Sequence, residues 1–230
     1  MTAKISVIIP TLNAGDSLPA CLTALIEGLT AGLIKVMLIT DGGPGNKTIL
    51  IADDAGAHLV TGPASRGGQL RRGAAVARGQ WLMVLHADTV LEPGWSRAVG
   101  DHLNDSDRAA YFRLKFRATG IMPTWVAGWA NLRSALFGLP YGDQGLLVPR
   151  AAYVRAGGYP DQPLMEDVAL VRALTRTSGD RPVALPATAV TGPERYQRAG
   201  WLRRGARNLW TLLRYMRGTD PERLAAAYRR

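Results

Sequence analysis

Cysteine is almost absent from this chain of 230 residues, which carries only Cys21. A single thiol excludes an internal disulfide framework and is typical of proteins from a reducing compartment. The sequence also lacks a run of about 18 uncharged apolar residues, the length that a membrane-spanning helix requires. A strand pattern begins at Lys4, and no signal peptide is recognisable before it. We therefore expect a cytoplasmic protein that is soluble or peripheral to the inner face of the membrane.

Two common nucleotide-binding motifs are missing as well. No Gly-x-Gly-x-x-Gly follows the first predicted strand and no P-loop is present, which argues against a dinucleotide-dependent dehydrogenase and a P-loop kinase. Acidic residues are too few to balance the basic ones, at 18 against 28, and the formal net charge is +10. Such a charge favours an anionic partner: a nucleic acid, an anionic membrane surface or a phosphorylated substrate.

Short apolar runs alternate with helical patterns through the first 85 residues. The runs predict buried strands of an α/β protein, and the segments between them predict helices. Three successive strand–helix units imply a mostly parallel central sheet, flanked by helices, with right-handed crossovers. The predicted strands cover residues 5–9, 36–39, 58–61 and 81–85.

The middle of the chain predicts a more varied set of elements. A helix is expected over 93–103, and residues 109–116 alternate like a half-exposed strand, which suggests a position at the sheet edge. Residues 122–137 predict a helix whose aromatic face packs into the core or forms a lid. A short strand over 146–148 and a helix from 164 to 179 follow.

The last 35 residues are expected to form a basic, amphipathic helical extension (196–230) to a domain of residues 1–195. An apolar stripe at helical spacing is interleaved with arginines. Either this helix contacts an anionic membrane surface or a diphosphate-bearing lipid acceptor, or it packs its stripe on the domain and leaves the arginines in water. The basic residues do not alternate with stacking aromatics along one face, so nucleic acid is not the expected partner. The stripe is Leu202, Ala206, Leu209, Leu213 and Met216.

Polar side chains from distant points of the sequence should meet at one edge of such a sheet, because ligands bind outside the carboxyl ends of its strands. Asp41, after the second strand, suits a nucleoside. Asp88, after the fourth, is suited to hold a divalent cation that offsets diphosphate charge. Glu166 or Asp167, at the start of a later helix, is suited to accept the proton of an acceptor hydroxyl. A basic loop adds Arg66 and Gln69.

Taken singly, each of these residues also fits a turn, a helix cap or a solvated loop charge. As an ordered set, their segments resemble the signature blocks of family-2 glycosyltransferases with the GT-A fold, the nucleotide-diphospho-sugar transferase fold. The SRGGQ, HAD and GDQG motifs further resemble a small bacterial subgroup labelled arsenosugar-biosynthesis glycosyltransferases. The family blocks are residues 5–13 (ISVIIPTLN), 41–43 (DGG), 85–89 (LHADT) and 165–167 (MED).

The resemblance implies an inverting transfer of a sugar from a nucleoside diphosphate-sugar to an acceptor hydroxyl, by a single in-line displacement. It implies that Asp88 binds Mg²⁺ or Mn²⁺, that Asp167 is the base and that Glu166 lies near the acceptor. Asp143 and Gln144, from the subgroup's GDQG motif, are expected on the acceptor side. Donor contacts are expected from Pro10, Thr11, Asn13, Asp41, Arg66, Gln69, His86, Ala87 and Asp88.

One departure from the family pattern concerns the cation. His86 stands where the family has the first acidic residue of Asp-x-Asp, which leaves Asp88 as the single carboxylate of the motif. No histidine follows His102, so a late histidine ligand is excluded. A fixed positive charge is an alternative means of neutralising a diphosphate. The candidates for it are Arg195, Arg198, Arg203 and Arg204.

Two other functions compete with the transferase. A sugar nucleotidyltransferase shares a similar sheet but usually has a basic, glycine-rich loop after its first strand, where this chain has TLNAG at residues 11–15. A non-catalytic binding module for nucleic acid or an anionic membrane is suggested by the net charge alone. The sequence identifies neither the sugar nor its acceptor.

Overall fold

The first part of the chain folds as alternating strands and helices, in the predicted order. The computed structural model describes residues 3–43 and 46–229. Side chains of β1, β2 and β4 are buried on both faces, as expected of central strands in a parallel sheet. The elements up to β4 are β1 (Ile5–Thr11), α1 (Leu18–Thr30), β2 (Ile34–Asp41), α2 (Asn46–Asp54), β3 (His58–Thr61), α3 (Arg66–Val76) and β4 (Trp81–Val84).

The second part adds four strands and most of the helices. β8 and the short β5 are strands that the sequence patterns do not predict; Pro186 interrupts the β8 pattern. The elements are β5 (Val90–Leu91), α4 (Trp95–Asp105), β6 (Ala110–Phe116), α5 (Ile121–Phe137), the 3₁₀ turn η1 (Gly142–Gln144), β7 (Leu146–Pro149), α6 (Arg150–Arg155), α7 (Glu166–Ser178), β8 (Val183–Thr191), α8 (Glu194–Ala199), α9 (Trp201–Met216) and α10 (Pro221–Arg229).

The strands of the described residues form one eight-stranded sheet in the order β3-β2-β1-β4-β7-β6-β8-β5. β1 to β4 are parallel, β6 and β8 are parallel to each other, and β7 and β5 run antiparallel to their neighbours. The mostly parallel sheet is therefore confirmed. The predicted edge position of residues 109–116 is wrong, because β6 lies between β7 and β8; its alternation arises from Arg113 and Lys115, which are exposed on one face.

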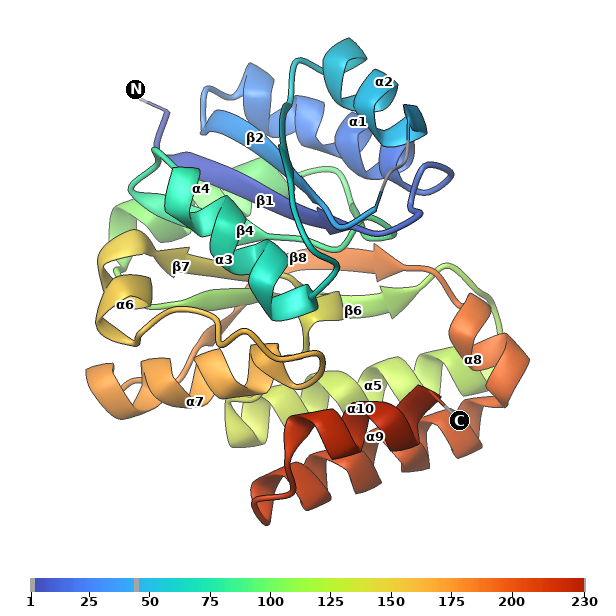
Figure 1. Cartoon of the computed structure of the whole chain (residues 1–230). Helices are drawn as coiled ribbons and strands as arrows, with labels where there is room; N and C mark the ends of the chain where they lie inside the picture. The colour runs from blue at the N-terminus through green and yellow to red at the C-terminus, as the bar shows by residue number, and fades with distance from the viewer. Residues whose placement is uncertain (1–2, 44–45, 230) are drawn as a thin grey trace.

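Helices cover both faces of the sheet (Figure 1). Successive residues of a strand point to opposite faces. Val7 and Ile9 of β1 therefore belong to a core shared with α1, α2 and α4, whereas Ile8 belongs to a second core shared with α3, α6 and α7. The two cores hold the central strands in place, and their carboxyl ends form a fixed edge on which a site can be built.

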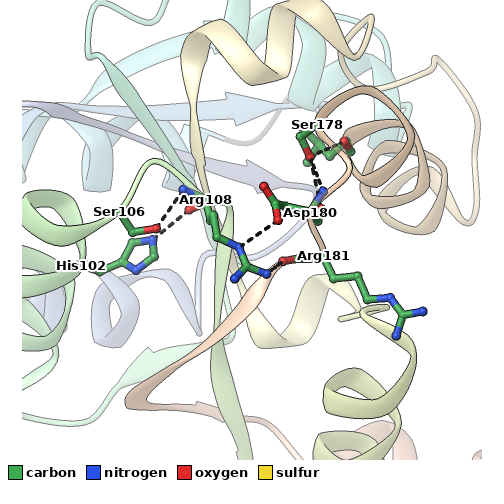
Figure 2. A network of polar contacts seen from close by, with 7 residues as sticks. His102, Ser106, Arg108, Ser178, Asp180 and Arg181 are labelled. Carbon is green, nitrogen blue, oxygen red and sulfur yellow. Dashed lines mark hydrogen bonds and ion pairs between the residues drawn. The ribbon is translucent and has the colours of Figure 1, made fainter.

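A polar network ties together the amino ends of β6 and β8, opposite that edge (Figure 2). Arg108 donates from Nη2 to the Arg181 carbonyl at 2.7 Å, and its Nε lies 3.8 Å from the Asp180 carboxylate. His102 Nε2 lies 2.8 Å from the Arg108 carbonyl, and the Arg108 N–H donates to Ser106 Oγ at 3.1 Å. These contacts join the end of α4 to the turn between α7 and β8.

The C-terminal helices pack on the rest of the chain. Phe116 of β6 contacts Tyr196 and Trp201 edge-to-face, with ring centroids 4.8 and 5.0 Å apart. Leu212 of α9 packs with Met165 and Val168 at the start of α7. The predicted boundary after residue 195 falls within α8, and residues beyond it pack on β6, α7 and α5. None of the helices described is both long and apolar enough to cross a membrane.

Candidate active site

Two neighbouring cavities open at the carboxyl ends of β1 and β4. The larger, about 720 Å³, lies between the segment after β1, the start of α3 and the loop before α7. The smaller, about 110 Å³, lies between η1, the start of α7 and the inner side of α8 to α10. They share four lining residues, Arg66, His86, Asp88 and Arg195. The two cavities therefore adjoin at these four residues.

Eight of the nine residues predicted to contact the donor line the larger cavity. The exception is Asp41, which is 3% exposed and accepts a hydrogen bond from Thr11 Oγ1 at 2.8 Å. Among the described residues, Asp41 thus supports the cavity wall at Thr11 from behind. The eight that line the cavity are Pro10, Thr11, Asn13, Arg66, Gln69, His86, Ala87 and Asp88.

Gln69 fastens the ends of two strands together. Its Nε2 donates to the carbonyls of Thr11 at 2.7 Å and Thr40 at 2.6 Å, which lie near the ends of β1 and β2. The side chain is buried although it borders the larger cavity. Its amide nitrogen is occupied by backbone, so the residue stabilises the shape of the predicted donor site.

The turn before α7 has an unusual backbone. Met165 has φ of 63°, in the left-handed region, which costs a non-glycine residue roughly 1–2 kcal/mol. Its side chain is buried against Val168 and Leu212, and this packing holds the backbone in place. The two residues that follow, Glu166 and Asp167, begin α7 and are directed to different surroundings.

Asp167 lines the smaller cavity with its carboxylate held at both oxygens. Oδ2 accepts the N–H of Gly142 at 2.7 Å, and Oδ1 accepts the N–H of Val168 at 2.7 Å. The positive end of the α7 dipole stabilises negative charge at this position. The carboxylate is therefore oriented before any ligand binds.

Glu166 is buried and lines neither cavity. Its Oε1 lies 3.5 Å from Nε of Arg66, and among the described residues its Oε2 has no hydrogen-bond partner. Burial, reinforced by the charge of Asp167, raises the pKa of Glu166 above its usual range, and Arg66 opposes this shift. In this position Glu166 supports Arg66, and it is Asp167 that faces the predicted acceptor space.

Asp143 and Gln144 are adjacent but lie in different environments. Asp143 lines the smaller cavity, and burial, opposed by Arg133, raises its pKa to about 6. Gln144 is fully buried instead of facing the acceptor side: its Oε1 accepts from Ser134 Oγ at 2.6 Å, and its Nε2 donates to the Phe112 carbonyl at 3.4 Å. Gln144 anchors η1 to α5 and β6.

Comparison with known proteins assigns this arrangement to a family. The sequence model described as Glycosyl transferase family 2 matches residues 6–135, more than half of the chain. The chain belongs to glycosyltransferase family 2. Among curated proteins, it is similar to the PGL/p-HBAD biosynthesis glycosyltransferases of Mycobacterium tuberculosis and Mycobacterium bovis, with 37% identity over 93 residues. That match covers 37% of this chain and 36% of each relative.

Solved structures confirm the GT-A fold of this family-2 glycosyltransferase. Glucosyl-3-phosphoglycerate synthase from Mycobacterium tuberculosis, in complex with Mn²⁺, UDP and phosphoglyceric acid, is similar with a TM-score of 0.56 and 19% identity, over 83% of this chain and 69% of that one. Mannosyl-3-phosphoglycerate synthase from Rubrobacter xylanophilus gives a TM-score of 0.56 and 16% identity, over 83% and 66%. The narrower resemblance to the arsenosugar subgroup stays a prediction.

The cation predicted for this family-2 glycosyltransferase has a single carboxylate to bind it in the HAD motif. In the part of the chain that the structure describes, no group of three His, Cys, Asp or Glu residues is close enough to hold a metal. Burial, with the charges of Arg66 and Arg195, holds the pKa of His86 well below its usual range, so its ring is neutral. Mg²⁺ is commonly held by one or two carboxylates plus substrate phosphates, an arrangement that Asp88 between the two cavities fits.

Several lining residues come from the C-terminal helices and were not predicted. Asn208 of α9 and Tyr228 of α10 border the smaller cavity, and Glu222 of α10 borders the larger. No local motif marks them, because they reach the site only when α9 and α10 fold back over it. Of the four arginines considered for the diphosphate, Arg195 lines both cavities and Arg204 lines the smaller.

Proposed function

We propose that this protein transfers a sugar, with inversion, from a nucleoside diphosphate-sugar in the larger cavity to an acceptor hydroxyl in the smaller one. The observation that carries the proposal is the junction of the cavities at Arg66, His86, Asp88 and Arg195. A donor and an acceptor held there would place the acceptor oxygen next to the anomeric carbon, which an in-line displacement requires.

The larger cavity suits the donor. Its volume of about 720 Å³ lies within the usual range for small-molecule sites. Arg66 and Arg195 supply positive charge where the cavities meet, which suits the diphosphate. UDP is present in the structure of glucosyl-3-phosphoglycerate synthase, which shares the fold. The base and ribose would then lie along Pro10, Thr11 and Asn13, with Asp41 behind them.

A divalent cation, Mg²⁺ or Mn²⁺, would be held by Asp88 and the donor's phosphate oxygens. When bound, it would offset the charge that develops on the leaving diphosphate. Arg66 and Arg195 would contribute to the same task from the protein. His86 stands where the family has a second acid and adds no negative charge, so Asp88 is the single carboxylate of the motif beside the diphosphate.

Asp167 is the proposed base. It would accept the proton of the acceptor hydroxyl as the hydroxyl oxygen bonds to the anomeric carbon and the bond from that carbon to the diphosphate oxygen breaks. The hydrogen bonds from Gly142 and Val168 hold the carboxylate in one orientation for this step. Residues 1–195 would form the catalytic domain, and residues 196–230 would close the acceptor cavity with Arg204, Asn208 and Tyr228.

The test is to incubate the purified chain with a panel of nucleotide-sugars and measure binding and sugar release, with and without Mn²⁺ or Mg²⁺. We expect one donor to bind and to be hydrolysed slowly without an acceptor. Asp88→Asn should lose the response to the cation. Asp167→Asn should keep donor binding and lose about 10²–10⁴-fold in turnover, the usual contribution of general acid–base catalysis.

The rival functions are distinguished by a parallel incubation with a nucleoside triphosphate and a sugar 1-phosphate. A sugar nucleotidyltransferase would release pyrophosphate from a nucleoside triphosphate and a sugar 1-phosphate. A binding module would show neither reaction. If no nucleotide-sugar binds with or without a cation, the proposal is wrong; if Asp167→Asn turns over like the parent, Asp167 is not the base.

A further inference from the structure

The surfaces of α5 and α9 are rich in exposed apolar side chains. Eighteen large apolar side chains are exposed among the described residues, and eleven of them lie on these two helices. Exposed apolar patches of this kind mark interaction sites. The eleven side chains, here called the α5–α9 surface, are Ile121, Trp125, Trp129, Leu132, Leu136, Phe137, Leu202, Leu209, Trp210, Leu213 and Met216.

α5 turns its aromatic side outward. The exposed fraction is 86% for Ile121, 58% for Trp125 and 47% for Trp129. The single charged residue of α5, Arg133, points inward instead: it is 9% exposed, and its guanidinium carbon lies 3.5 Å from the centroid of the Tyr141 ring. Of the two expected roles of this aromatic face, packing into the core is therefore wrong, and the outer face of α5 carries no charge.

α9 also turns its apolar side toward solvent and its polar side inward. Its apolar stripe faces solvent, with Leu202 61% and Met216 45% exposed, whereas Thr211 and Leu212 are buried. Arg204 and Asn208 are turned toward the smaller cavity. The alternative in which this helix packs its apolar stripe on the domain is therefore excluded by the structure.

The two helices lie side by side on one side of the molecule (Figure 1). Val126 and Ala127 of α5 share a small core with Trp201 at the start of α9. The outward sides of both helices therefore belong to one region of the surface. Three of the chain's six tryptophans are exposed, and all three lie in this region.

The charged residues on these two helices all have the same sign. Neither α5 nor α9 contains an acidic residue, and Arg203 and Arg217 are exposed near the two ends of the α9 stripe. Tryptophan favours the boundary between lipid and water, and arginine binds anionic headgroups. We propose that the α5–α9 surface docks on an anionic phospholipid bilayer, with its apolar side chains among the headgroups and its arginines on the phosphates.

A second copy of the chain is a less suitable occupant. A two-fold interface would bring the same surface of two molecules together, and with it Arg203 and Arg217 of both, from chains that each carry a net charge of +10. No acidic residue on either helix would compensate that repulsion. An anionic bilayer instead supplies the opposite charge around an apolar interior.

Docking in this way would place the smaller cavity one helix away from the membrane. α9 would contact the bilayer with its outer side while Arg204 and Asn208 on its inner side border the cavity. The proposal concerns binding alone, so it stands or falls independently of the transferase reaction.

The test is co-sedimentation of the purified full chain with vesicles of phosphatidylcholine, either alone or with about one third phosphatidylglycerol. We expect at least tenfold stronger binding to the anionic vesicles, weakened by salt, and a blue shift of tryptophan fluorescence. Trp129→Glu combined with Trp210→Glu should reduce binding at least tenfold, because both charges would enter the lipid boundary. Arg203→Gln and Arg217→Gln should each reduce it about fivefold.

Val154→Glu is the matched control. Val154 is 65% exposed on α6, outside the α5–α9 surface, so this variant should bind vesicles like the parent. Circular dichroism and sedimentation velocity on each variant report folding and oligomeric state. The proposal fails if the parent does not bind anionic vesicles at low salt, if Val154→Glu weakens binding as much as the tryptophan variant, or if the parent is a dimer that the tryptophan variant converts to monomers without either binding lipid.

Discussion

Arg66 and Glu166 form an ion pair between the first residue of α3 and the first residue of α7. The Nε and Oε1 atoms are 3.5 Å apart, with side-chain exposures of 34% and 3%. The pair joins two helix starts that are 100 residues apart in the sequence. Since Arg66 lines both cavities and Glu166 lines neither, the carboxylate holds the guanidinium at the point where donor and acceptor would meet.

Replacing Arg66 should destabilise the protein, because it leaves the buried carboxylate of Glu166 without its partner. We expect Arg66→Met to lower the free energy of unfolding by about 1–3 kcal/mol, at the low end for buried pairs because Arg66 is partly solvated. Arg66→Met combined with Glu166→Gln should be more stable than Arg66→Met alone, because the uncompensated carboxylate is gone. Urea unfolding measures the free energy of unfolding of both variants.

Lys115→Met is the control for the Arg66 and Glu166 variants. Lys115 pairs with Glu92 on the surface, and its loss should change stability by less than about 1 kcal/mol. Additive effects of Arg66→Met and Glu166→Gln would show that the pair is not coupled.

Gly67 should tolerate no side chain. A Cβ there would lie 2.0 Å from the Pro160 carbonyl oxygen, which is backbone and part of the loop that leads to α7. We expect Gly67→Ala to displace that loop, to lower the free energy of unfolding by about 1–3 kcal/mol and to weaken donor binding. Gly128→Ala, in α5 with open space around it, should be neutral or stabilising by up to about 1 kcal/mol. Equal melting temperatures of the two variants would contradict the close approach.

Gln144 should matter for folding more than its motif suggests. Gln144→Leu removes the buried hydrogen bonds of Gln144 to Ser134 Oγ and to the Phe112 carbonyl, and it should lower the free energy of unfolding by about 1–3 kcal/mol. It should also lower turnover, because η1 supplies the Gly142 N–H that orients Asp167. Gln80→Leu makes the same change at an exposed residue and should leave both quantities unaltered. Parent-like stability of Gln144→Leu would argue against the anchoring role.

The carboxyl group of Asp143 should make the free energy of unfolding depend on pH. Burial raises its pKa to about 6 in the folded protein, above the value of an unfolded aspartate near 3.8. Between these values the folded state binds more protons, so this residue's contribution to the free energy of unfolding falls as pH rises from about 4 to about 6. Asp143→Asn should remove this residue's contribution to the slope of the free energy of unfolding against pH.

The measurement is a set of urea unfolding curves across this pH range for the parent and Asp143→Asn. Asp54→Asn, at an exposed position of α2, controls for the loss of one carboxylate elsewhere. A slope of Asp143→Asn identical to that of the parent would show that the raised pKa does not contribute.

Local patterns predicted the strands of the parallel half and eight of the residues that line the larger cavity. Apolar runs mark buried strands, and residues directly after them must lie at the carboxyl edge of the sheet. For this reason the position of Thr11 and Asp88 at this edge could be predicted without knowledge of the packing. Gln144 was not, because a polar residue in a motif is equally compatible with a ligand contact and with a buried anchor to helices distant in sequence.

By itself, the sequence determined the alternating strands and helices, the family, and the set of polar side chains at one edge of the sheet. Only the tertiary structure decided that Glu166 pairs with Arg66, that β6 is an interior strand and that the apolar sides of α5 and α9 face solvent. The physical reason is that periodicity specifies which residues share a helix face, whereas the direction in which that face points depends on contacts with elements far along the chain.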